Sequence, residues 1–132
     1  MREILFRGKR NDNGEWAVSG DVFLGGKRKY IYIPNPDTDM SAKAYLCREV
    51  IPETVGQYTG LTDKNGKEIF EGDIVKDCYG RIAQCLYNET RYRLLFNGTH
   101  YTRELEFASE VEYEIIGNIH DNPELLGGAN ND

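Results

Sequence analysis

The stretch TVGQYTGLTDKNGKEIFEGDIVK, residues 54–76, holds four glycines and seven charged residues around two short apolar runs. Asp and Asn side chains bond to nearby backbone N–H groups, and Gly adopts positive φ at little cost, so these residue types mark sharp reversals of the chain. The stretch therefore predicts two turns, at 63–66 and 71–73, with strands at 68–70 and 74–79. The predicted turn residues are Asp63, Asn65, Gly66, Gly72 and Asp73.

The same glycines and charges raise the question of a ligand-binding loop. A phosphate-binding loop needs four residues between its two glycines and a Lys followed by Ser or Thr. Here five residues separate Gly60 from Gly66, and Lys67 is followed by Glu68. A calcium-binding loop that began at Asp63 would need Gly at its sixth position, where Glu68 stands instead. The spacing excludes both sites, and the stretch is predicted to be scaffold.

The rest of the chain repeats short β-branched or aromatic runs separated by Gly, Asn and Asp, which is typical of an all-β or mostly β fold. Asn13 and Gly14 predict the turn of a first hairpin. Asn122 and Pro123 suit the start of a short C-terminal helix, since Asn caps helices and Pro fits their first turn. The apolar residues of the segment 104–111 fit neither the period of a helix nor that of a strand, and the segment is predicted to be irregular or a short helical turn. The other predicted strands are 3–9, 15–24, 29–33, 45–51, 55–58, 81–87, 92–96 and 112–120.

Length and composition fit a single globular domain of 132 residues, 39% hydrophobic and 29% charged. No apolar run approaches the roughly 20 residues that a membrane helix needs. The first ten residues, MREILFRGKR, place charges where a secretory signal carries its apolar segment. A cytoplasmic protein with no membrane contact is therefore expected.

Charge is unevenly distributed along the sequence. The net charge is −6, yet from Glu104 onward there are eight acidic residues and no Lys or Arg. An acidic segment repels a polyanion, so a nucleic-acid site would have to lie earlier in the chain. The simpler interpretation of the acidic segment is a solvated face.

Cysteines and histidines give no sign of a reactive centre. Cys47, Cys78 and Cys85 form no CxxC pair, which argues against a disulfide framework and against a zinc knuckle, and they are predicted to be free, buried thiols. His100 and His120 lie in different segments and are predicted to be single satisfied side chains rather than metal ligands. No catalytic triad or carboxylate pair stands out. We therefore expect no enzyme activity, no metal and no cofactor.

Two short stretches combine basic and aromatic residues. Small barrels hold single-stranded nucleic acid in this way, because bases stack on Tyr while Lys or Arg contacts phosphates. The alternative, which we favour, is that the same Tyr side chains cover one face of a sheet that has no nucleic-acid role. The candidate contact residues are Lys27, Arg28, Lys29, Tyr30 and Tyr32 in the first stretch, and Arg91 and Arg93 in the second.

Three blocks of the sequence together resemble one family. The first block is FRGK at 6–9 with GEW at 14–16 and GD at 20–21, the second is ETVGQYTGLTDKNGKEIFEGDIVK at 53–76, and the third is IIGNIHDNPELL at 115–126. On these blocks the chain resembles the YopX-like proteins of phages and prophages. The resemblance implies a mostly β protein with a small SH3-like barrel, preceded by a hairpin-rich N-terminal part. It implies no activity and no catalytic residues.

These features together predict one YopX-like domain over 1–127, with a β-hairpin region at 1–52, an SH3-like barrel part at 53–121 and a disordered tail at 128–132. The expected function is that of a non-enzymatic protein-interaction module in a bacterial cytoplasm. Its partner would be an unknown protein or a second copy of the chain. A nucleic-acid-binding module that uses the two basic–aromatic stretches is the alternative.

Overall fold

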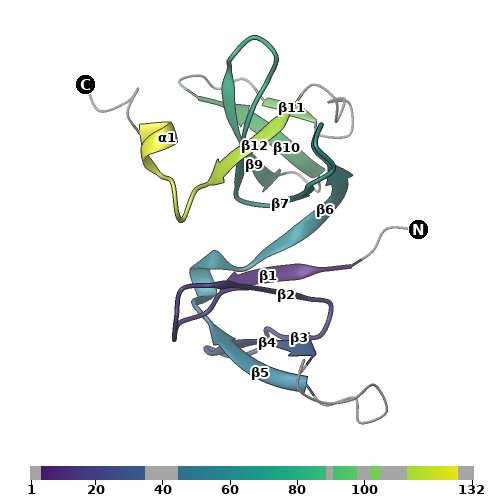
Figure 1. Cartoon of the computed structure of the whole chain (residues 1–132), viewed down its shortest axis with the longest axis vertical. Coiled ribbons are helices and arrows are strands. Elements are labelled where there is room, and N and C mark those ends of the chain that lie inside the picture. Colours follow the sequence, from purple (N-terminus) through teal and green to yellow (C-terminus); the bar gives the residue numbers. More distant parts are fainter. Residues whose placement is uncertain (1–3, 35–44, 89–90, 98–101, 105–112, 128–132) are drawn as a thin grey trace. The chain divides into compact units, whose positions relative to one another are not determined.

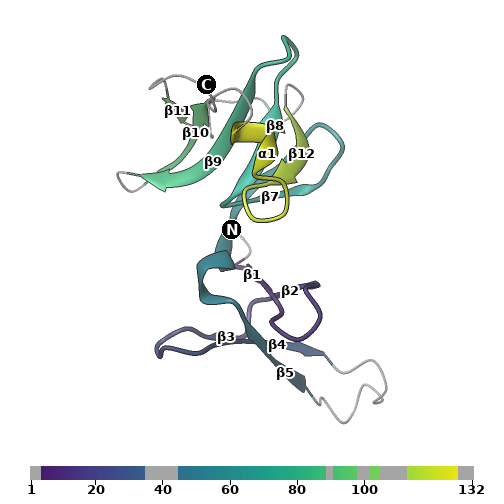
Figure 2. The same ribbon diagram turned by 90° about the vertical axis from the view of Figure 1, so that its left-hand side faces the viewer.

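The chain folds into two compact units, Met1–Gln57 and Tyr58–Asp132. The computed structural model describes residues 4–34, 45–88, 91–97, 102–104 and 113–127. Figure 1 labels the C-terminal helix and most of the strands, and Figure 2 shows them from a second direction, with β8 labelled. Each unit is built from short antiparallel strands and buries apolar residues of its own.

The first unit packs a hairpin and a three-stranded sheet around a small core. The core residues Ala17, Ile31 and Val50 are at most 3% exposed. Gly8 lies directly over Val50, because a Cβ added at Gly8 would come within 2.9 Å of the Val50 side chain. The hairpin is β1 (Phe6–Lys9) with β2 (Trp16–Ser19), and the sheet is β3 (Val22–Phe23), β4 (Lys29–Pro34) and β5 (Tyr45–Val50), followed by the 3-10 turn η1 (Pro52–Thr54).

The second unit contains a five-stranded antiparallel sheet with the order β11-β10-β9-β8-β12. Its core gathers Ile69, Val75, Ala83, Cys85, Leu94, Phe96 and Tyr113, each at most 5% exposed. Strand β6 begins in the first unit, where Gln57 pairs with Phe6, and continues in the second, where Tyr58 pairs with Phe70. The elements are β6 (Gly56–Thr62), β7 (Glu68–Phe70), β8 (Asp73–Lys76), β9 (Ile82–Asn88), β10 (Arg91–Phe96), β11 (Thr102–Glu104), β12 (Glu114–Asn118) and α1 (Glu124–Gly127).

The prediction of a mostly β fold that ends in a short helix is confirmed. The described strands form open antiparallel sheets, and in the five-stranded sheet β11 and β12 are the two edges. Barrel closure is therefore not seen among the described residues. The predicted tail at 128–132 and most of the ambiguous segment 104–111 lie outside them. Neither short helix in the described part of the chain approaches the length and apolar character of a membrane span.

Three predicted elements differ from the observed ones. The strand predicted at 55–58 continues to Thr62, because Gly60 adopts φ 92° and the pairing of β6 with β7 shifts its register there instead of ending. The strand predicted at 15–24 is divided into β2 and β3 around Gly20. Strand β11 was not predicted, because its three residues are too few to show a period of two.

Gly72 holds the turn between β7 and β8 in the left-handed region, with φ 97°. Its N–H donates to the carbonyl of Cys85 (2.8 Å), and its carbonyl accepts from the N–H of Ile119 (2.9 Å). This residue therefore joins three segments of the second unit through its backbone alone. A side chain at this φ would strain the backbone that makes both hydrogen bonds.

Replacing Gly72 by Val is expected to lower the free energy of unfolding by about 1–3 kcal/mol, because a β-branched residue is strained at positive φ. Denaturant titration measures the change. Gly25→Ala is the control, since its backbone is not in that region and an added Cβ would lie 3.9 Å from the Phe23 ring. An unchanged midpoint for Gly72→Val would contradict the argument.

Candidate interaction surface and its supporting turns

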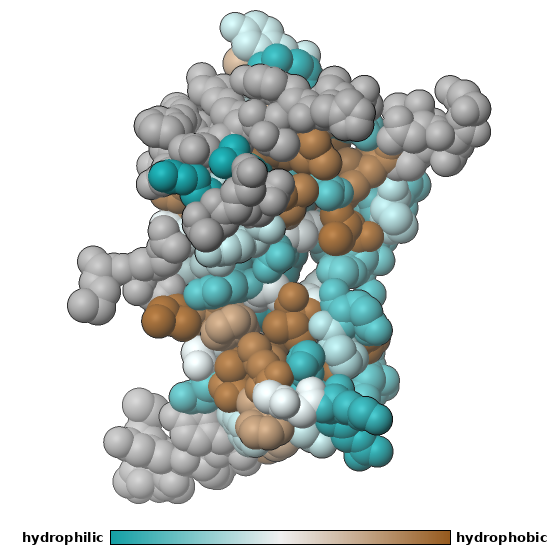
Figure 3. All heavy atoms as spheres, turned by 180° about the vertical axis from the view of Figure 1, so that it is seen from behind, coloured by the Kyte–Doolittle hydropathy of each residue, from teal (hydrophilic) through white to brown (hydrophobic). Residues whose placement is uncertain are grey.

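The sheet β3–β4–β5 has one buried face and one exposed face. Ile31 is fully buried on the inner side, whereas Phe23 is 52% exposed on the other. Side chains alternate along a strand, and the register pairs Phe23 with Tyr30 and Tyr32 with Cys47. We call the exposed side the outer aromatic face, made of Phe23, Tyr30, Tyr32, Cys47 and Glu49. Figure 3 shows one side of the molecule, on which hydrophobic residues reach the surface beside hydrophilic ones.

Cross-strand contacts order the side chains of the outer aromatic face. The Phe23 and Tyr30 rings have centroids 6.5 Å apart at an interplanar angle of 39°. The Phe23 ring packs over Gly25 and Gly26, where an added Cβ would lie in ordinary van der Waals contact with it, at 3.9 and 3.6 Å. The charge that Cys47 can carry raises the pKa of the Tyr32 hydroxyl, and their hydrogen bond adds to this.

The first basic stretch is not uniformly available to a ligand. The Lys29 ammonium donates to the carbonyls of Leu24 (2.9 Å) and Gly26 (3.0 Å), so it closes the turn between β3 and β4. Lys27 is exposed. Arg28 is exposed as well, with its Nε 4.0 Å from a Glu49 carboxylate oxygen. Two of the three predicted cations therefore face solvent, and the third is part of the scaffold.

Strand alternation separates the second basic stretch from its aromatic partner. Tyr92 packs edge-on against Tyr87, with ring centroids 5.0 Å apart. Both lie on the same face of the β9–β10 pair as Leu94, which belongs to the core. Arg91 and Arg93 lie on the opposite side of β10. These arginines therefore do not share a face with the Tyr predicted to work beside them. They also belong to the second unit, whereas the first basic stretch belongs to the first.

Two hairpins of the second unit use the same turn. In the β6–β7 turn, the Asp63 side chain accepts from the N–H groups of Asn65 (2.8 Å) and Lys67 (2.9 Å). In the β8–β9 turn, Asp77 accepts from Tyr79 (2.9 Å) and Arg81 (2.8 Å). Gly stands at the fourth position of both, with φ 82° at Gly66 and 84° at Gly80.

Asp77 was not among the predicted turn residues, although the sequence held the signal for it. Both turns read Asp, two residues, Gly and then Lys or Arg. The Asp77 carboxylate also receives a bond from Arg81 Nε at 2.6 Å. The Arg81 guanidinium lies over the Tyr79 and Phe96 rings, 5.5 and 5.1 Å from their centroids.

Asp63 also connects its turn to a distant strand. Its second carboxylate oxygen accepts from the N–H of Ile115 at 3.0 Å. Burial alone would raise the pKa of Asp63, but the N–H groups of Ile115, Lys67 and Asn65 outweigh it and hold that pKa below its usual range. Asp73, the other predicted turn carboxylate, is also buried and accepts from the N–H of Phe70 at 2.7 Å.

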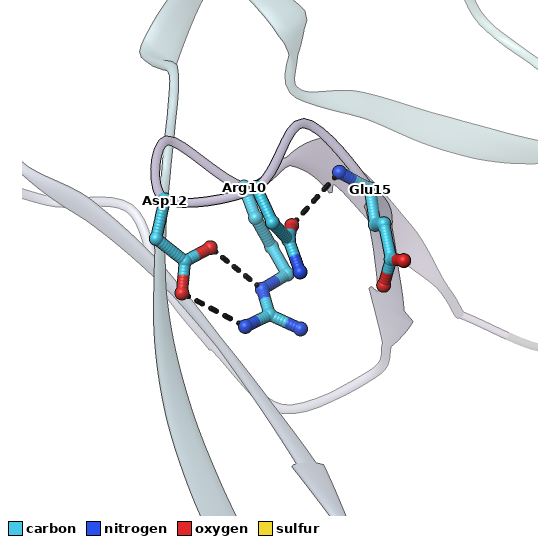
Figure 4. A network of polar contacts seen from close by, with 4 residues as sticks. Arg10, Asp12 and Glu15 are labelled. Atoms are coloured by element: carbon cyan, nitrogen blue, oxygen red, sulfur yellow. Dashed lines mark hydrogen bonds and ion pairs between the residues drawn. The ribbon is translucent and has the colours of Figure 1, made fainter.

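Asn13 and Gly14 lie in the β1–β2 turn, where Gly14 has φ 76°. The Asn13 side-chain oxygen accepts from the N–H of Glu15 (2.9 Å), and Gly14 N–H donates to the carbonyl of Arg10 (3.0 Å). Figure 4 shows the Arg10 guanidinium joined to the Asp12 carboxylate by two bonds, of 3.0 and 2.8 Å. The hydrogen bond from Arg10 lowers the pKa of Asp12, which lies at the surface.

Comparison with known proteins identifies the family. A family model described as YopX protein matches residues 5–127. The chain belongs to the YopX family. Its fold is similar to the crystal structure of protein EF1440 from Enterococcus faecalis, with a TM-score of 0.54, 25% identity, and coverage of 96% of this chain and 99% of that one. No curated protein matches significantly.

The thiols of this YopX-family chain differ from the prediction. All three cysteines are free, as expected, but Cys47 and Cys78 are exposed and Cys85 alone of them is buried. Cys47 lies on the outward side of β5, and Cys78 falls in the turn after β8 rather than in a strand. His100 lies outside the described residues. His120 is half-buried, and its backbone N–H donates to the side-chain oxygen of Asn118. Among the described residues no three potential ligands gather at a metal site.

Because the pKa of Asp63 is lowered in the folded chain, we expect the fold to lose stability at acidic pH. A carboxyl whose pKa is lower in the folded chain stabilises it above the unfolded value, about 3.9, and loses that contribution as the pH falls through the folded value. The melting temperature should therefore decrease when the pH is lowered below about 4. Asp63→Asn should lower the free energy of unfolding at pH 7 by about 1–3 kcal/mol, because an amide N–H₂ would face the Ile115 N–H.

Denaturant unfolding at pH 7 and pH 3 measures both effects. The difference between wild type and Asp63→Asn should shrink at pH 3, because below the unfolded pKa of about 3.9 the unfolded wild type is favoured by taking up a proton at Asp63, whereas Asn takes up none. Asp12→Asn is the control, because its surface ion pair contributes little. A constant difference across this range would show that the Asp63 charge has no part in stability.

Proposed function

We propose that this YopX-family chain is a non-enzymatic protein-interaction module and that the outer aromatic face is its contact surface. The observation that carries the proposal is the 52% exposure of Phe23 on a sheet whose other side is completely buried at Ile31. Aromatic residues and Arg are enriched in protein interfaces and supply most of their hot spots. An exposed Phe beside Tyr and Arg has this composition.

The rigidity of the face supports the same role. Phe23, Tyr30 and Tyr32 stand on paired strands, and the Phe23–Tyr30 ring contact restrains two of the three side chains before any partner arrives. Ordered side chains lose little conformational entropy on binding, so more of the contact free energy appears as affinity. Arg28 and Glu49 supply charges of both signs at the margin of the face.

The proposal includes a setting and an architecture. We place the chain in a phage or prophage and in a bacterial cytoplasm, acting on a host or phage protein or on a second copy of itself. We also propose that residues 53–121 form an SH3-like barrel. The five antiparallel strands of the second unit and the β6–β7 hairpin support this, because such barrels are built from strands of this number and length.

A nucleic-acid-binding module remains the second candidate. Exposed Lys27 and Arg28 lie beside two tyrosines of the outer aromatic face, which is an arrangement suited to single strands. The engagement of Lys29 in a turn and the separation of Arg91 and Arg93 from Tyr92 weigh against it. The protein-interaction role is therefore the better supported of the two.

Affinity capture with tagged chain from lysogenic or infected cells tests the protein-interaction role. Phe23→Ser should reduce recovery of each specific partner by about tenfold or more, as expected for loss of an aromatic hot spot. Val18→Ser is the control, because Val18 is exposed to a similar extent (42%) on the other sheet. The proposal would be contradicted if wild type and both variants recovered only the proteins that are also captured without the tagged chain.

Titration with labelled single-stranded and double-stranded nucleic acid at low salt tests the nucleic-acid-binding role. Phosphate contacts by Lys27 and Arg28 would give binding that weakens as salt is added, and a double replacement of both by Ala would reduce the salt dependence. Absence of binding at low salt would reject the nucleic-acid role, since the electrostatic attraction is greatest there.

A further inference from the structure

Tyr79, in the β8–β9 turn, is the most exposed large hydrophobic side chain among the described residues. It is 81% exposed, compared with 52% for Phe23. Residues 78–81 are all exposed, so the turn ends in a convex tip that carries the Tyr79 ring. A single exposed aromatic residue is common on protein surfaces. The other contacts of the turn show whether the fold itself needs this one.

The β6–β7 turn has the same backbone bonds as the β8–β9 turn and therefore serves as an internal comparison. In each turn the N–H of the first residue, an Asp, donates to the carbonyl of the fifth (2.8 and 2.9 Å). The N–H of the fourth residue, a Gly, donates to the carbonyl of the first (3.0 Å in both). The third residue is Asn65 in one turn and Tyr79 in the other. Turns favour Asn and do not favour Tyr, so the turn itself does not explain Tyr79.

Arg81 holds the Tyr79 ring in place. Its guanidinium lies over the Tyr79 ring and over the ring of Phe96, which belongs to the core, at 5.5 and 5.1 Å from their centroids. The Asp77 carboxylate fixes this guanidinium through the 2.6 Å bond from Nε. Arg81 therefore covers one face of the Tyr79 ring and restrains it. A restrained ring loses little conformational entropy when a partner binds it.

Shape and charge indicate which kind of partner fits this tip. A single ring on a convex turn matches a recess rather than a flat surface. Residues 58–132 hold seven basic and fourteen acidic residues, so this unit repels nucleic acids and anionic membrane surfaces. A protein with basic residues around the recess suits it better. The recess should be apolar with a polar group at its base, because a buried Tyr hydroxyl usually finds a hydrogen-bond partner.

We propose that Tyr79 is a second protein contact of this chain and that its ring enters an apolar recess on a partner protein, with Arg81 packed behind it. Tyr and Arg are the side chains most often found at interface hot spots, together with Trp. The site goes beyond the proposed function, because it belongs to the second unit and shares no residue with the outer aromatic face. The two matched turns then differ in use: Asp63 ties its turn to Ile115, whereas the other turn presents Tyr79 to a partner.

Quantitative affinity capture from lysogenic or infected cells, with the tagged full chain as bait, gives the first test. Tyr79→Asn places in this turn the residue that its counterpart already has, so the circular dichroism spectrum and the melting temperature should stay unchanged. Recovery of at least one specific protein should fall by about tenfold or more. Asn65→Ser, in the matched turn, is the control and should recover that protein like wild type.

Two results of the capture would overturn the proposal. One is equal recovery of every specific protein with wild type and Tyr79→Asn. The other is a Tyr79-dependent recovery that disappears when the lysate is treated with nuclease, because the ring would then contact nucleic acid and not a protein.

The exposed thiols show which surface the captured protein covers. Cys78 is exposed next to Tyr79, so a recess that encloses the ring also shields this thiol from iodoacetamide. With the purified partner at about ten times its Kd, alkylation of Cys78 in the wild-type chain should slow by about tenfold, because about one chain in ten stays unbound. A Cys78 that remains fully reactive would overturn the Tyr79 contact. Cys47, exposed on the outer aromatic face, reports separately in the same sample whether that face is covered.

Discussion

The carboxylate of Asp63 is the contact on which the second unit depends most. It is 2% exposed and accepts three backbone N–H bonds, two within its own turn and one from Ile115, 52 residues further along the chain. Two neighbouring backbone bonds, from Lys64 to the Tyr113 carbonyl and from Ile119 to the Gly72 carbonyl, complete the same connection. The segment 54–76 therefore holds β12 by polar contacts at both ends of that strand. Its glycines and charged residues form the turns, and its apolar residues Ile69 and Val75 are buried in the core.

Strand alternation decides which side chains can act together. Consecutive basic and aromatic residues look like one cluster in the sequence, but a strand sends neighbours to opposite faces. Tyr92 is drawn to the core and leaves Arg91 and Arg93 on the other side, and Lys29 is used to close a turn while Tyr30 faces outward. What remains as a surface combines residues from three strands, with Tyr30 of the central strand β4 between Phe23 and Glu49. That surface is visible only once the register of β3, β4 and β5 is known.

The sequence predicted the elements well where a local rule governs them. The Asp, Asn and Gly turns and the short runs between them depend on neighbouring residues, so β7 has its predicted bounds and β1, β4, β5 and β10 differ by a few residues. The extension of β6 through Gly60 was missed, because a glycine within a strand and a glycine in a turn have the same sequence signal. The exposure of Cys47 and of Phe23 depends on how the strands of the first unit pair and pack, which no local pattern reveals.

The two units differ in how far their polar and apolar groups are used within the fold. In the second, buried carboxylates and left-handed glycines fix the loops of an acidic sheet, so its polar groups are largely committed to its own backbone. In the first, the buried core is the cluster of Ala17, Ile31 and Val50, and Gly8 lets a strand lie directly on Val50, while the sheet keeps Phe23 on its outer side. A sheet that covers one face with its own hairpin and leaves Phe23 52% exposed on the other keeps apolar area in contact with solvent. A protein contact on this face would bury that apolar area, because Phe23 and the tyrosines of β4 stand on the same side of the sheet.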